Sequence, residues 1–214
     1  MKKEIYYKKK IYYSGILIAI TRTIIPLILY FLKTRIKQIK GYIQKKGAVL
    51  IAVHHEELAD QFVIAISTKR KLCWIADTTS PSSKRSLADA WFTKWLFMRL
   101  GAVPIDKKNP KRNKNLFNYL LFLLQRGQAI VFFPEAYVSS ERNDEKFGVF
   151  KDGVVRLALE YEKTFNKKIP VYPIGLKYTK IKFKKEVSLN IGKPIYLKER
   201  KDSFKLFDEL KRLS

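Results

Sequence analysis

The stretch "AVLIAVHHEELADQF", residues 48–62, predicts a strand, a turn and the start of a helix in direct succession. An unbroken apolar run at 48–53 is typical of a strand that is buried on both faces. The residues from about 58 to 67 can form a helix. Between them lie both histidines of the chain, followed by two glutamates and, a little later, an aspartate. Strand-to-helix turns are where α/β proteins commonly carry functional groups.

The same alternation of strands and helices continues along the chain. Further strands are expected at 72–76, 101–105, 129–133, 169–178 and 187–192, and further helices at 86–100, 112–127, 151–163 and 202–213. This order predicts the α/β class, with a mixed, mostly parallel central sheet covered by helices. We expect one domain over residues 45–214, preceded by a basic and apolar helical segment over residues 1–44.

Positive charge dominates the composition. The 214 residues include 44 Lys+Arg and 19 Asp+Glu, which gives a formal net charge of +25. Such a surface attracts polyanions, namely nucleic acid, an anionic membrane or phosphate-bearing substrates, although an AT-rich genome or a hot habitat also produces lysine-rich surfaces. The single cysteine, Cys73, excludes an intramolecular disulfide. It lies in an apolar stretch and indicates a buried structural thiol in a protein of the cytosolic side.

The N-terminal stretch "IYYSGILIAITRTIIPLILYFL", residues 11–32, is nearly long enough to cross a membrane. However, Arg22 lies at its middle, Pro26 follows, and lysines border the stretch on both sides. We therefore expect a helix or helix pair lying in the interface of an anionic leaflet, at the cytoplasmic face of the cell membrane. A soluble core helix and a single membrane span are the two alternatives.

The spacing of His55 and Asp60 favours His55 as the working histidine. Five residues on a continuous helix separate two side chains by about 140°, so this pair can meet only across a turn, with Asp60 in the first helical turn. There the carboxylate can accept a hydrogen bond from one imidazole nitrogen and leave the other as a base. His54 has Ala59 at the same spacing, and its side chain should point to the opposite side of the strand. A surface or capping role is the alternative for this pair taken alone.

Several segments together resemble the phospholipid/glycerol acyltransferase family, typified by lysophosphatidic acid acyltransferase. The family's Asn-His, four residues, Asp motif corresponds to "HHEELAD", and its glycine, short strand and arginine to "GAVPIDKK", with Lys107 in the arginine position. Its Phe-Pro-Glu-Gly-Thr-Arg-Ser motif corresponds to "FPEAYVSS". The later segments "FKDGVVRLAL", "IPVYPIGLKY" and "IGKPI" follow in the family's order. The resemblance covers roughly residues 45–200.

This resemblance implies a glycerol-3-phosphate acyltransferase-like fold and an acyl transfer in phospholipid biosynthesis. The acyl group would pass from acyl-CoA or acyl-carrier protein to a hydroxyl of lysophosphatidic acid or a related lysophospholipid. His55 would be the general base, and Asp60 would orient it. The hydroxyl would attack directly, so no acyl-enzyme is implied. No metal is implied either, and CoA or carrier protein enters as the donor substrate and is not a cofactor.

The resemblance also implies an acceptor-binding group of residues, namely Lys107, Phe133, Pro134, Glu135, Ala136, Tyr137 and Arg142. The third motif departs from the family pattern, since Ala136 replaces glycine, Tyr137 replaces threonine and Val138 replaces arginine. Arg142 is the candidate to replace the lost arginine. His54 stands where the family has asparagine. These departures predict a remodelled acceptor pocket.

The expected partners are an anionic membrane surface, a lysolipid acceptor, and acyl-CoA or the acidic carrier protein, with no nucleic acid; the sequence does not predict the oligomeric state. One alternative is a family member that binds lipid without turnover or uses another acceptor. A nucleic-acid-binding protein has only the charge in its favour, because no zinc-finger spacing or RNA-recognition signature is present. A metalloenzyme using "HHEE" is disfavoured, because adjacent residues rarely converge on one ion.

Overall fold

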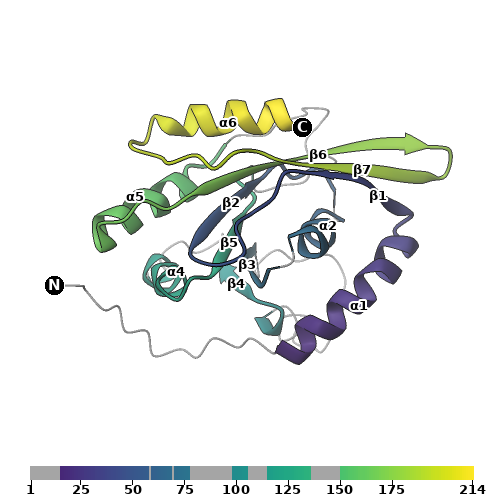
Figure 1. Ribbon diagram of the computed structural model, residues 1–214, viewed down its shortest axis with the longest axis horizontal. Helices are drawn as coiled ribbons and strands as arrows, with labels where there is room; N and C mark the ends of the chain where they lie inside the picture. Colours follow the sequence, from purple (N-terminus) through teal and green to yellow (C-terminus); the bar gives the residue numbers. More distant parts are fainter. Residues whose placement is uncertain (1–14, 58, 69, 78–97, 106–114, 136–149) are drawn as a thin grey trace.

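The computed structural model describes residues 15–57, 59–68, 70–77, 98–105, 115–135 and 150–214. These residues form a seven-stranded sheet in the order β1-β7-β6-β2-β5-β3-β4, with helices on both faces (Figure 1). The strands are β1 Thr34–Lys40, β2 Val49–Val53, β3 Leu72–Asp77, β4 Ala102–Ile105, β5 Ala129–Phe132, β6 Val171–Ile181 and β7 Lys184–Ile191. The helices are α1 Gly15–Phe31, α2 Asp60–Ser67, α4 Leu116–Gln125, α5 Gly153–Phe165 and α6 Asp202–Leu213.

The sheet is mixed and mostly parallel, which confirms the predicted fold class. Strand β2 pairs in parallel with β5 and β6, and β3 pairs in parallel with β4 and β5. Strand β7 turns back antiparallel to β6 and then pairs in parallel with β1. Strand β2 therefore lies in the middle of the sheet, with neighbours on both sides.

The central strand β2 packs against helices on both faces. Val49, Ile51 and Val53 point into one apolar cluster, which includes residues of α1 and α2. Leu50 and Ala52 point into the other, which includes residues of α4, α5 and α6. All five side chains are fully buried. This double cover is why the sequence is apolar without interruption from residue 48 to residue 53.

Residues 34–40 correct the expectation that the N-terminal segment over residues 1–44 is helical. "TRIKQIK" forms β1 at the edge of the sheet, where its residues from Lys37 onward are exposed. An edge strand with one solvated side accepts charged residues, so this strand has no apolar run that could have predicted it. The division of the chain at residue 45 stays a prediction, and residues 86–97 of the helix expected at 86–100 lie outside the described residues.

Helix α1 packs on α2 through the buried side chains of Ile25 and Leu29. Arg22, the charge in the middle of the apolar stretch, donates a hydrogen bond to the backbone carbonyl of Arg70 at 2.5 Å. Arg70 is itself buried and donates to the carbonyls of Gln44, Gly47 and Gly127. Among the described helices, none has the length and apolar character needed to cross a membrane.

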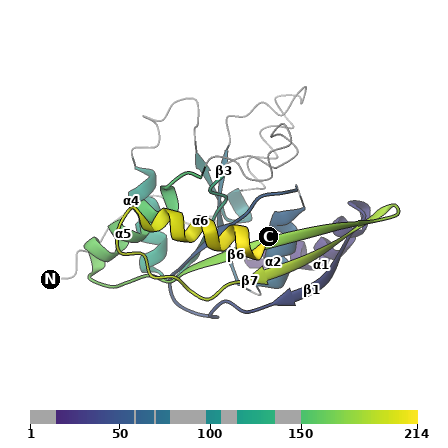
Figure 2. The same cartoon turned by 90° about the horizontal axis from the view of Figure 1, so that it is seen from above.

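The hairpin of β6 and β7 extends beyond the neighbouring strands. Its tip and the C-terminal end of α1 lie at the same end of the molecule in both views (Figure 1, Figure 2). A backbone hydrogen bond from the Lys185 N–H to the Lys33 carbonyl, 2.7 Å long, joins the hairpin to the turn between α1 and β1. The protruding hairpin is thus tied to the N-terminal helix.

Candidate active site

The two histidines follow directly on β2 and point to opposite sides. The N–H of His54 still pairs with the Ile174 carbonyl of β6, at 3.1 Å, so the extended backbone continues through His54. The His54 side chain is 0% exposed, whereas that of His55 is 19% exposed. The strand alternation predicted this difference, and His55 is the histidine that solvent can reach.

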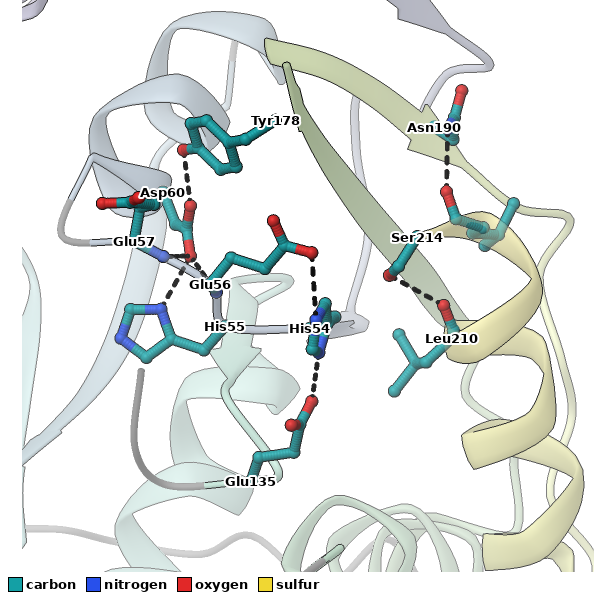
Figure 3. Close-up of polar contacts among 11 residues, drawn as sticks. His54, His55, Glu56, Glu57, Asp60, Glu135, Tyr178, Asn190, Leu210 and Ser214 are labelled. Carbon is teal, nitrogen blue, oxygen red and sulfur yellow. Dashed lines mark hydrogen bonds and ion pairs between the residues drawn. The ribbon is translucent and has the colours of Figure 1, made fainter. Parts of the chain in front are cut away.

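Asp60 holds the His55 imidazole and closes the turn with the same oxygen (Figure 3). Its Oδ2 lies 2.7 Å from Nδ1 of His55 and accepts the backbone N–H groups of Glu56 and Glu57 at 2.8 and 3.0 Å. Asp60 is the first residue of α2 and is completely buried. A carboxylate that accepts from Nδ1 favours the tautomer with its hydrogen there, so Nε2 is the nitrogen that can receive a proton.

Tyr178 forms a hydrogen bond with the second oxygen of this carboxylate, a contact that was not predicted from the sequence. Its hydroxyl donates to Oδ1 of Asp60 at 2.6 Å, from strand β6 next to β2. Burial of the hydroxyl, together with the Asp60 charge, raises the pKa of Tyr178 far above its usual range. Tyr178 therefore stays protonated and donates at any ordinary pH. Both Asp60 oxygens are held, which fixes the carboxylate that holds His55.

His54 lies between two carboxylates on the other side of the strand. Its Nδ1 is 2.5 Å from Oε1 of Glu135, and its Nε2 is 3.3 Å from Oε1 of Glu56. Burial lowers the pKa of this imidazole, but the contacts with Glu135 and Glu56 raise it more, so the net pKa is above the usual value. These contacts favour the charged form of the ring, and His54 joins the loop after β2 to the loop after β5.

Phe133, one of the residues predicted to bind the acceptor, packs against the imidazole of His55. Its ring centroid is 4.3 Å from that of His55, and the same ring stacks with Trp74 at 6.2 Å. Pro134 accepts the Lys151 N–H through its carbonyl at 2.9 Å, which joins the third motif to the segment before α5. The aromatic contact limits rotation of the His55 ring about its side-chain bonds.

Of the remaining predicted site residues, Glu135 is buried, and the others lie in segments that the structure does not describe. The Glu135 side chain, expected to hold the acceptor, is almost fully buried and contacts His54. Lys107, Ala136, Tyr137 and Arg142 lie outside the described residues. The structure brings His55, Asp60 and Phe133 together, and it places Glu135 in a second cluster with His54. Within the described part of the chain, no group of His, Cys, Asp and Glu side chains is suited to hold a metal ion.

Comparison with known proteins identifies the family of this chain. A family model described as "Acyltransferase" matches residues 34–177, well over half of the sequence. The chain belongs to the acyltransferase family. The match includes β2 and the pair of His55 and Asp60. Tyr178 lies one residue beyond the matched range.

Two individual proteins are similar to it. The 1-acyl-sn-glycerol-3-phosphate acyltransferase of Helicobacter pylori (strain J99 / ATCC 700824) is 27% identical over 116 residues, which is 54% of this chain and 45% of that protein. The match thus spans less than half of the relative's length. The crystal structure of the 1-acyl-sn-glycerophosphate (LPA) acyltransferase PlsC from Thermotoga maritima superposes with a TM-score of 0.66. It covers 91% of this chain and 77% of that chain at 17% sequence identity, and shows that the two share a fold.

Proposed function

We propose that this protein transfers a fatty acyl group from a thioester, acyl-CoA or acyl-carrier protein, to a hydroxyl of lysophosphatidic acid or a close variant, in phospholipid biosynthesis. One observation carries the proposal. Asp60 is buried, and both of its carboxylate oxygens accept hydrogen bonds. One of them, Oδ2, lies 2.7 Å from Nδ1 of His55, a histidine that solvent can reach. That is the arrangement a general base needs.

In the proposed reaction, Nε2 of His55 removes the proton of the acceptor hydroxyl while its oxygen attacks the thioester carbonyl carbon. The tetrahedral intermediate collapses with cleavage of the carbon–sulfur bond, and the departing thiolate takes the proton from the imidazolium. Ester and thiol are the products, and no acyl-enzyme forms. Asp60 stabilises the imidazolium by about 4 kcal/mol, for unit charges about 4 Å apart at an effective dielectric constant of about 20.

The acceptor assignment is supported by the names of the two similar proteins and by the positive charge of the chain. Lys107 and Arg142 are the proposed phosphate partners, and Ala136 and Tyr137 form part of the proposed acceptor side. Glu135 would act indirectly in this scheme. Its contact with His54 fixes the end of β5, and with it the position of Phe133 against the His55 ring.

We also propose that α1 lies in the interface of an anionic leaflet at the cytoplasmic face of the membrane. Its inner face is buried against α2, while Ile20, Ile24, Leu27 and Phe31 are exposed on the outer side. Spacings of four, three and four residues place these four side chains on one helical face. An apolar face that the fold leaves in contact with solvent suits a lipid surface.

An acylation assay with labelled acyl-CoA and acyl-carrier protein, against a panel of lysolipid acceptors, tests the proposed function. His55→Ala should lower turnover by a factor of about 10² to 10⁴, the usual contribution of a general base. His54→Ala is compared with it and should lose less turnover than His55→Ala, because His54 acts on the site only through Glu135 and Phe133. Wild-type turnover by His55→Ala, or a large loss from His54→Ala alone, would contradict the assignment. Acceptor binding by the wild type without turnover on any acceptor would identify a lipid-binding protein instead.

A further inference from the structure

The tip of the β6–β7 hairpin combines apolar and basic side chains in a way that folding does not explain. Phe183 is 86% exposed and Ile181 is 45% exposed. They lie within "KYTKIKFKK", residues 177–185, which contains no acidic residue. A phenylalanine this exposed contributes almost nothing to the core, and it costs solubility.

The turn itself also lacks the residues that a tight hairpin favours. Ile181 and Lys184 are paired, so the loop consists of Lys182 and Phe183 alone. Lys182 has a φ of 49°, in the left-handed region where glycine or asparagine is the usual choice. A lysine and a phenylalanine in these two positions therefore point to a role for their side chains outside the fold.

The hairpin tip lies beside the exposed end of α1. The backbone hydrogen bond from Lys185 to Lys33, 2.7 Å long, holds the hairpin against the turn that follows α1. The exposed side chains of Tyr30 and Phe31 lie directly before that turn, and the exposed Leu32 lies within it. Figure 1 and Figure 2 both show the tip and this end of α1 at the same end of the molecule.

We propose that the hairpin tip is a second membrane-contacting element, which enters an anionic bilayer together with the outer face of α1. Phe183 and Ile181 enter the boundary between headgroups and acyl chains, and the exposed lysines Lys180, Lys182 and Lys184 contact the lipid phosphates. Charge decides between the possible occupants. A second copy would bring the same cluster of lysines against this one, whereas an anionic leaflet neutralises it.

This inference rests on the proposed placement of α1 in the membrane interface. It does not depend on acyl transfer, because lipid binding is measured separately. It also relates the membrane to the site. Ile181 is three residues beyond Tyr178 on β6, a distance of about 10 Å at the usual rise of a strand. A bilayer in contact with the tip therefore comes close to the strand whose tyrosine fixes Asp60.

Flotation of the full chain with lipid vesicles tests the proposal. The wild type should bind phosphatidylglycerol/phosphatidylcholine vesicles, and Phe183→Ser should lower its partition coefficient about tenfold. Phe204→Ser is the matched control, because Phe204 is 71% exposed but lies on α6, and its partition should stay within about twofold of the wild type. Lys182→Gln with Lys184→Gln should weaken binding to these vesicles, and much less to pure phosphatidylcholine.

A fluorophore on an introduced cysteine locates the contact independently. The single native cysteine, Cys73, is buried, so an environment-sensitive label on Lys184→Cys reports on the tip. Its emission should shift to the blue when phosphatidylglycerol/phosphatidylcholine vesicles are added, and a label on Lys201→Cys beside α6 should not shift.

The proposal is overturned if Phe183→Ser floats like the wild type, if Phe204→Ser loses binding equally, if the wild type does not bind vesicles, or if the tip label gives no shift. Sedimentation that shows a Phe183-dependent dimer, with vesicle binding unchanged, would assign the surface to a second copy and overturn it as well. Failure of the acyltransferase proposal is distinguishable, because vesicle binding would persist without turnover. Phe183→Ser should keep wild-type turnover with a short-chain acceptor dissolved as monomers.

Discussion

Tyr178→Phe tests whether the geometry of the site depends on the second oxygen of Asp60. The substitution removes one hydroxyl and keeps the ring in place. It deletes the 2.6 Å hydrogen bond to Oδ1, while the contacts of Oδ2 with His55 and two backbone N–H groups persist. A hydrogen bond to a buried charged group contributes about 1.5–3 kcal/mol, and each 1.4 kcal/mol is a factor of ten.

We therefore expect kcat to fall by a factor between about ten and a hundred, while KM stays unchanged. The tyrosine is a positioning residue that acts through Asp60, so substrate binding should be unaffected. Urea unfolding should report a destabilisation of about 1–3 kcal/mol. Tyr172→Phe, on the same strand, is the control and should change neither quantity appreciably. Wild-type kcat in Tyr178→Phe, or an equal loss in Tyr172→Phe, would refute this role for the tyrosine.

Two further substitutions test the buried polar contacts. His54→Asn should destabilise the protein by about 3 kcal/mol near pH 6, because it leaves Glu135 and Glu56 without their imidazolium. Since the folded-state pKa of His54 is raised, the stability it contributes is fully present below the unfolded pKa of about 6.5 and is lost as pH rises through the folded value. The difference between the two proteins in urea unfolding should thus shrink with rising pH, and a difference that grows would contradict the protonated bridge. Arg70→Ala should cost about 3 kcal/mol in the same measurement, because three carbonyls lose a buried donor; a loss below about 0.5 kcal/mol would show that water replaces the guanidinium.

The sequence predicted the parts of the site that are close together along the chain. His55 and Asp60 are five residues apart, so the strand, the turn and the helix between them decide whether they meet, and each of these has a local signal. The double cover of β2 was predictable for the same reason, because an apolar run of its length is typical of a strand in the interior of a parallel sheet.

The contacts that join distant segments could not be predicted in this way. Tyr178 is 118 residues from Asp60, and Glu135 is 81 residues from His54. Only the neighbouring positions of β5 and β6 beside β2 bring these pairs together. Tyr178, the final tyrosine of "IPVYPIGLKY", could have been found with one more fact. If the sheet order were known, its strand would be placed next to β2, and the tyrosine would become a candidate partner for Asp60. The contact of His54 with Glu135 had no such signal, because Glu135 lies on a loop.

Strand β1 shows a different limit. Its sequence, "TRIKQIK", reads as a basic flank of the apolar stretch, and only pairing with β7 makes it a strand. A strand at the edge of a sheet does not need an apolar pattern. Such a pattern was the only sequence signal by which this strand could have been predicted.

Asp60 contacts both the His55 ring and the backbone of the turn, and this has a consequence for how the protein can change in evolution. The carboxylate that orients His55 also accepts the two backbone N–H groups that shape the turn before α2. Selection for a folded chain therefore preserves Asp60 even where selection for turnover is absent, whereas we infer no comparable folding role for His55. A descendant that lost the proposed activity and kept the proposed lipid-binding surface would be expected to lose the histidine first and to retain the aspartate. An aspartate at this position would therefore indicate that the fold is kept, whereas the proposed reaction depends on the histidine five residues before it.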